Sequence, residues 1–234
     1  HNTTDALLCR MNNPEHIVVT FGGDMLHADT RSNKTEMSGN VLDVDSRYHM
    51  VVEKAVTACY DVVAMASEVA EKVTVIILEG NHSWHSEVWL AQVLRAAYSQ
   101  CDRVDIVMQR SARKHMVWGD NLLVWTHGDG VAMTKWQGII STEFAQLWGQ
   151  TKWRHLKMGH IHHKNARSAK SLVTSDQNGG WVENHGLLVE YLPALSATDA
   201  WHASKGFIGS QQAMTGFEYH KKQGLITRLY EPAH

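Results

Sequence analysis

Cysteine and proline are both scarce in this chain of 234 residues, which has three of each. The cysteines are widely spaced and form no Cys-x-x-Cys pair, which argues against a disulfide framework and against a thiolate zinc site. We therefore expect a reducing, cytoplasmic compartment. With 44% hydrophobic and 20% charged residues, the composition is typical of a globular protein and excludes a generally disordered or collagen-like chain.

Long hydrophobic runs and an excess of either charge are also missing. The run from Val73 to Leu78 is far shorter than the ~20 apolar residues of a membrane span. The first residues lack the basic-then-apolar pattern of a signal peptide, so we expect no membrane partner. A net charge of −2 provides no global field for nucleic acid, and any recognition of anions must be local.

Histidine, in contrast, is abundant, with sixteen residues, and there are nine tryptophans. Neutral imidazole is the commonest metal ligand in proteins, although a single histidine more often lies at the surface or in a satisfied core position. The positions of the histidines therefore decide their meaning. The tryptophans leave a dimer open as the oligomeric state.

Predicted strands and helices alternate along the chain. The β-branched run from Ile17 to Phe21 and the run from Val73 to Leu78 predict buried strands. Apolar residues at helical spacing predict a long amphipathic helix over 45–72 and a second helix over 87–98. This alternation favours an α/β fold.

Further elements are expected in the second half of the chain. Strands are predicted at 104–108, 114–118, 122–126, 154–158, 187–192, 213–220 and 225–230, and a helix is predicted over 134–147. Residues 119–121 and 221–224 predict hairpin turns. No internal repeat or linker interrupts the chain, so we expect residues 1–234 to form one domain.

Four predicted strands end in polar residues next to glycine: Gly23-Asp24, Gly80-Asn81-His82, His127-Gly128 and Gly159-His160-Ile161-His162. Residues at the carboxyl ends of strands converge on one crevice in an α/β sheet. The resulting oxygen and nitrogen donors suit divalent ions such as Mn²⁺, Fe²⁺, Zn²⁺ or Ni²⁺. The ordered set therefore predicts a metal site.

These blocks, in this order over residues 17–165, resemble those of the calcineurin-like metallophosphoesterases. The second block, Gly23-Asp24-Met25-Leu26-His27, is similar to the exonuclease branch that includes the Mre11 and SbcD nucleases. The segments 199–206 and 214–220 resemble phage-encoded members. The resemblance implies a four-layer α/β/β/α sandwich with mixed sheets and two divalent ions, with Mn²⁺ favoured.

The resemblance also implies a role for each site residue. Asp24 would bridge two metals and take part in catalysis, and His162 would bind the first metal. The second metal would be held by Asn81, His127 and His160. His82 would polarise the phosphate and protonate the leaving oxygen.

The sequence departs from the family pattern in two places. Ser83 follows His82 where the family usually has Asp or Glu, so His82 is a weaker acid or Asp129 substitutes for that carboxylate. No Asp-x-His block occurs, and the residues before Ile17 read as a short helix and a turn. We therefore expect that the chain begins inside the natural domain and that an upstream strand carries this block.

A cationic segment surrounds the last block. Between Glu143 and Asp176 there is no acidic residue, whereas lysine and arginine occur at 152, 154, 157, 164, 167 and 170. Such a segment would concentrate a phosphate-bearing substrate, although it is also typical of a solvated surface. The predicted substrate contacts are His27, Arg31, Lys34 and Lys164.

The leading functional prediction is a phosphoesterase that cleaves phosphodiester bonds with a metal-activated water, with a DNA or RNA nuclease as its favoured natural role. The modest charge argues against the nuclease. A small-molecule phosphodiesterase or phosphomonoesterase is the enzymatic alternative. The missing Asp-x-His block leaves a catalytically weak metal- or phosphate-binding module as the alternative outside enzymes.

Overall fold

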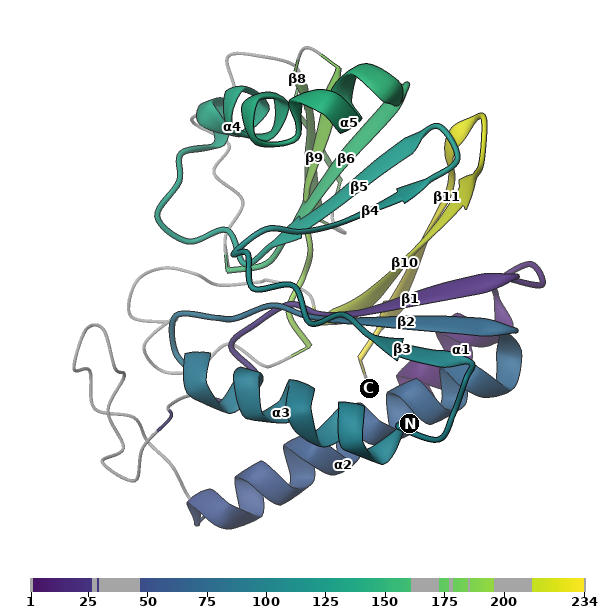
Figure 1. The fold of residues 1–234 in the computed structure, drawn as a ribbon, viewed down its shortest axis with the longest axis vertical. Coiled ribbons are helices and arrows are strands. Elements are labelled where there is room, and N and C mark those ends of the chain that lie inside the picture. Colours follow the sequence, from purple (N-terminus) through teal and green to yellow (C-terminus); the bar gives the residue numbers. More distant parts are fainter. Residues whose placement is uncertain are drawn as a thin grey trace. The chain divides into compact units, whose positions relative to one another are not determined.

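The computed structural model describes residues 2–26, 29, 47–160, 173–176, 179–184, 186–195 and 212–233. These residues form a mixed α/β protein with helices and several sheets (Figure 1). The chain divides into two compact units, an N-terminal unit that comprises mainly Thr3–Ala112 and a C-terminal unit that comprises mainly Arg113–His234. The assignment of both units to one metallophosphoesterase domain stays a prediction.

The N-terminal unit contains a parallel sheet in the order β1-β2-β3. Its strands are β1 (His16–Phe21), β2 (Lys72–Ile77) and β3 (Val104–Ile106), close to the predicted positions. Phe21, the last residue of β1, pairs with Ile77, the last residue of β2. The loops that follow these two strands therefore leave the sheet at the same edge.

Helices α1 (Asn2–Cys9), α2 (Tyr48–Val69) and α3 (Trp84–Ala97) complete this unit. Helices α2 and α3 lie along one face of the sheet (Figure 1). Val63 of α2, Leu94 of α3 and Val75 of β2 are fully buried in one core cluster there. Helix α3 begins three residues before the predicted start, because the Glu87 amide donates to the Ser83 carbonyl and closes an earlier turn.

The C-terminal unit contains a six-stranded mixed sheet in the order β4-β5-β6-β9-β8-β7. The strands are β4 (Lys114–Trp118), β5 (Asn121–Thr126), β6 (Trp153–Met158), β7 (Val173–Asp176), β8 (Gly179–Asn184) and β9 (Leu187–Tyr191). Neighbours β5, β6 and β9 are parallel, and the outer pairs are antiparallel. The sequence did not indicate β7 and β8.

Two short helices cover one face of this sheet. A 3₁₀ turn (η1, Met133–Lys135) leads into α4 (Trp136–Glu143), and α5 (Ala145–Gln150) follows it. The single helix predicted over 134–147 is interrupted at Phe144, which has φ −110° and ψ 35°. Trp136 and Ile140 of α4 pack on Leu156 of β6 in the second core cluster.

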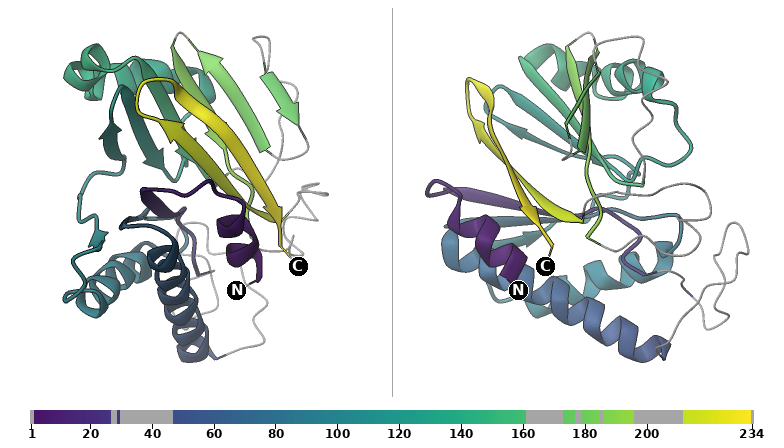
Figure 2. Two further views of the ribbon diagram at one scale, coloured as in Figure 1. Left: turned by 90° about the vertical axis from the view of Figure 1, so that its right-hand side faces the viewer. Right: turned by 180° about the vertical axis from the view of Figure 1, so that it is seen from behind.

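A long hairpin of β10 (Ala213–His220) and β11 (Gly224–Pro232) packs on the other face of the six-stranded sheet (Figure 2). The Asn121 side-chain amide donates to the His220 carbonyl at 3.0 Å, and the Trp153 indole donates to the Lys222 carbonyl at 3.0 Å. The predicted hairpin is confirmed.

Among the described segments, no helix combines the length and apolar character needed to cross a bilayer.

Candidate functional site

The first part of the candidate site is the pair of loops that follow β1 and β2. Asp24 lies in the first loop and has a left-handed backbone, with φ 54°. Its Oδ1 accepts a hydrogen bond from the backbone N–H of His82, in the second loop, at 2.8 Å. A non-glycine residue with positive φ is uncommon and points to a functional constraint. The N-terminal unit therefore brings the loop of Asp24 and the loop of Asn81 and His82 together.

Gly80 allows these two loops to approach closely. A Cβ added at Gly80 would lie 2.1 Å from Oδ1 of Asp24 and 2.3 Å from its backbone nitrogen. Contacts this short do not occur in folded proteins, so any side chain at position 80 would displace Asp24. The glycine in the Gly-Asn-His block is thus required by the position of the Asp24 carboxylate.

Glu87, which the sequence analysis did not single out, lies beneath the same loops. Its carboxylate accepts hydrogen bonds from the backbone N–H of Gly80, from the N–H of Met25 at 3.0 Å and from the Ser83 hydroxyl at 2.8 Å. Burial raises the pKa of Glu87 to about 7, and the donors of Gly80, Met25 and Ser83 oppose that rise. Ser83 and Glu87 are four residues apart, so at the start of a helix their side chains are neighbours. This spacing was the one feature of the sequence that could have pointed to Glu87.

Asp29 is a second buried carboxylate near the start of α3. Its side chain is 3% exposed and accepts hydrogen bonds from the backbone N–H groups of His85, at 2.7 Å, and Ser86, at 3.0 Å. These amides belong to the first turn of α3, where backbone N–H groups have no carbonyl acceptor within the helix. The carboxylate also complements the helix dipole. Asp29 therefore fixes the loop after β1 to the helix that follows His82.

In the C-terminal unit, His127 and His160 follow the neighbouring parallel strands β5 and β6. The last residues of these strands, Thr126 and Met158, pair with each other. Nδ1 of His160 lies 3.2 Å from Nε2 of His127, and the ring planes are inclined by 66°. His127 is buried, with 4% exposure, and His160 has a left-handed backbone with φ 61°. The unit thus brings two predicted ligands together.

The spacing of these two imidazoles fits a shared cation. Two nitrogens that each bind one ion at ~2.1 Å, at angles between a right angle and the tetrahedral angle, are about 3.0–3.4 Å apart. The His127–His160 separation of 3.2 Å falls in this range, and it is also the length of the hydrogen bond that the two rings form with each other. Imidazole nitrogens are among the ligands that borderline divalent ions take.

The predicted cationic segment is partly wrong, because two of its members are engaged inside the C-terminal unit. The ammonium of Lys157, 4% exposed, pairs with Glu190, which also pairs with Arg228 at 2.6 Å. The guanidinium of Arg154 donates to the carbonyl of Trp148 at 2.7 Å and stacks on its ring. Neither side chain is available to attract a phosphate.

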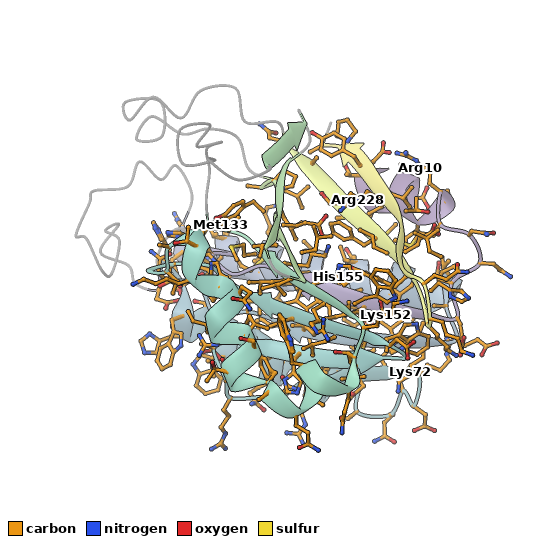
Figure 3. All side chains as sticks on the ribbon, turned by 90° about the horizontal axis from the view of Figure 1, so that it is seen from above. Arg10, Lys72, Met133, Lys152, His155 and Arg228 are labelled. Atoms are coloured by element: carbon orange, nitrogen blue, oxygen red, sulfur yellow. The ribbon has the colours of Figure 1, made fainter. Side chains whose placement is uncertain are left out.

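His155 lies on the same face of the sheet as Lys157. Figure 3 labels it together with Arg228, which belongs to the hairpin. His155 is 4% exposed. Its imidazole packs edge-on against the ring of Tyr219, with the two ring centroids 4.9 Å apart. Burial lowers the pKa of His155 to about 3, and the cations of Lys157 and Arg228 lower it further. His155 is therefore neutral in the folded protein at neutral pH.

Several predicted site residues lie outside the described residues. These are His27, Arg31, Lys34, His162 and Lys164.

Comparisons with protein-family models, with curated proteins and with solved structures found no match to this chain.

Proposed function

We propose that this protein is a metal-dependent phosphoesterase that hydrolyses phosphodiester bonds with a metal-activated water. The observation that carries the proposal is the 3.2 Å spacing of the His127 and His160 nitrogens at the ends of parallel strands. Imidazole nitrogens are common ligands of divalent cations, and here two of them lie side by side, His127 being buried. The resemblance of the four strand-end blocks to the metallophosphoesterases supplies the reaction class.

The proposed ligands come from both units. Asp24 would bridge two divalent ions, Mn²⁺ being the favoured metal, and His162 would bind the first ion. Asn81, His127 and His160 would bind the second. When bound, the ions would activate a water and neutralise charge on the phosphate. The four-layer α/β/β/α sandwich is the arrangement that we propose for the two sheets and their helices.

The chain's own groups perform the remaining steps in this proposal. His82 would donate a proton to the leaving oxygen, and its backbone N–H holds the Asp24 carboxylate at 2.8 Å. His27, Arg31, Lys34 and Lys164 would contact the phosphodiester. A nucleic acid is the favoured natural substrate.

Hydrolysis of bis-p-nitrophenyl phosphate with added Mn²⁺, compared with hydrolysis of p-nitrophenyl phosphate, tests the proposal. We expect the diester to be cleaved faster, and we expect EDTA to abolish the activity. His49→Ala, which removes an exposed imidazole of α2, is the matched control and should keep the activity. Preference for the monoester would contradict the diester specificity. If neither compound is hydrolysed in the presence of Mn²⁺, the proposed enzymatic activity is contradicted.

A further inference from the structure

Three backbone or hydroxyl donors from two loops converge on a single buried side chain, Glu87, which is 1% exposed. One carboxylate oxygen accepts from Gly80, in the loop after β2. The other accepts from Met25, in the loop after β1, at 3.0 Å and from the Ser83 hydroxyl at 2.8 Å. The carboxyl group of Glu87 thus connects the two loops through hydrogen bonds to both of its oxygens.

Ser83 extends this connection. It is fully buried, and its hydroxyl oxygen accepts a hydrogen bond from the N–H of Leu26 at 3.4 Å while donating to Glu87. Ser83 and Glu87 together therefore hold both loops against the first turn of α3. These hydrogen bonds are buried, so they are stronger than the same bonds in water.

The two connected loops carry the functional groups of the N-terminal unit. Met25 is adjacent to Asp24, and Gly80 lies two residues before His82. The His82 N–H donates to Asp24 across the gap between the loops. This contact depends on the distance between the loops, and Glu87 is hydrogen-bonded to both of them.

We propose that Glu87, acting through Ser83 and the backbone, is the positioning residue that holds Asp24 and His82 in their relative arrangement. Because it acts on a metal ligand and an acid catalyst, this inference rests on the proposed phosphoesterase function. Glu87 touches neither metal nor substrate in this account.

Glu87→Gln is the test variant, since the amide keeps the size of the side chain but presents an N–H₂ group to one of the donors. Leu94→Ala is the matched control, because Leu94 lies on the same helix and is fully buried in the hydrophobic core. We expect Leu94→Ala to lower the midpoint of unfolding, because the shorter side chain leaves a cavity in the core. Both variants are studied at a temperature at which circular dichroism shows that they are folded.

The first measurement is the backbone amide shift of His82 in metal-free protein, by ¹⁵N–¹H NMR. Its hydrogen-bond partner is Asp24 and not Glu87, so this signal reports the contact between the two loops. We expect the His82 signal to move in Glu87→Gln and to stay in place in Leu94→Ala. An unchanged His82 signal in Glu87→Gln would overturn the inference.

The second measurement is Mn²⁺ affinity together with kcat and KM for bis-p-nitrophenyl phosphate. Loss of a residue that orients metal ligands typically costs roughly 10–100-fold in affinity or activity. We expect a loss of this size in Mn²⁺ affinity and kcat for Glu87→Gln, with little change in KM, and neither loss in Leu94→Ala. Equal losses in both variants would reduce Glu87 to a stability role and overturn the inference.

The two proposals fail in different ways. A wild-type protein that neither binds Mn²⁺ nor cleaves the diester contradicts the proposed function. The His82 amide shift is recorded without metal or substrate, so it still decides whether Glu87 positions the loops.

Discussion

Gly80 shows at the scale of one residue how the candidate site depends on a missing side chain. The space that its Cβ would occupy is filled by Asp24. Gly22, two residues before Asp24, has nothing within 4 Å of the equivalent position. The two glycines lie in adjacent loops and differ mainly in this contact.

Replacement of each glycine by alanine tests this account. We expect Gly80→Ala to displace Asp24 and to reduce Mn²⁺-dependent hydrolysis by at least ~10-fold, as for other losses of ligand orientation. Gly22→Ala should leave the rate within about twofold, because its Cβ has room. Comparable rates for the two variants would contradict the close approach of Gly80 and Asp24.

His155 links the folded state to pH at the same scale. Its pKa is about 3 in the folded protein and about 6.5 when unfolded, so the unfolded chain binds more protons between these values. The free energy of unfolding should therefore fall as the pH decreases below about 6.5. Between pH 7.5 and 5 the loss from this one group is about 2 kcal/mol.

Urea unfolding of the wild type and of His155→Phe at both pH values measures this contribution. Phenylalanine keeps a ring against Tyr219 and cannot be protonated. The difference between pH 7.5 and pH 5 should be smaller in the variant by the amount due to His155. The same acid loss in both proteins would show that His155 does not couple folding to pH.

The residues that the sequence predicted best were those next to glycine at strand ends, because the strand, the turn and the polar group are consecutive. Asp24, His127 and His160 follow strand ends as expected, and their role as metal ligands stays a prediction. Glu87 could not be distinguished from a surface residue of α3, since its burial depends on loops far away in the chain. Arg154 and Lys157 looked like surface cations, and only the packing of their neighbours showed otherwise.

At the scale of elements, β6 and β9 carry a buried ion pair across the sheet. Lys157 and Glu190 are direct partners in the strand register, and Arg228 of the hairpin reaches the same carboxylate. Burial lowers the pKa of Lys157 well below its usual range. Desolvation of both charges is costly, so the pair is expected to specify how the hairpin docks more than to add net stability.

Removal of one partner should therefore be worse than removal of both. We expect Glu190→Leu to lower the free energy of unfolding by about 3–5 kcal/mol, because Lys157 and Arg228 lose the buried carboxylate with which both pair. The double variant Lys157→Met, Glu190→Leu should recover most of this loss. Additive losses in a double-mutant cycle measured by urea unfolding would contradict a coupled, buried pair.

The elements themselves differed in how far sequence could predict them. Strands with continuous apolar or β-branched runs, such as β1, β2 and β5, lie within a residue or two of their predicted bounds. Strands β7 and β8 have mixed polar composition and a Gly-Gly start, so no periodicity marked them. The break at Phe144 follows from packing of two short helices on the sheet rather than from a proline or glycine at that point.

At the scale of the whole molecule, the proposed metal centre takes its ligands from both units. Asp24 and Asn81 belong to the N-terminal unit, and His127 and His160 belong to the C-terminal unit. The sequence predicted that these strand ends converge on one crevice of a single domain. The joint use of these residues by one metal centre is the central claim.

Titration of Mn²⁺ into the metal-free protein, followed by the electron paramagnetic resonance signal of free Mn²⁺, tests this claim most directly. The compared proteins are the wild type, Asp24→Asn, His160→Ala, His82→Ala and the control His49→Ala. The account predicts weaker binding in Asp24→Asn and His160→Ala alike, since each removes a ligand of the shared centre, and wild-type binding in the other two variants. Wild-type Mn²⁺ affinity in either Asp24→Asn or His160→Ala would contradict a metal centre built from both units.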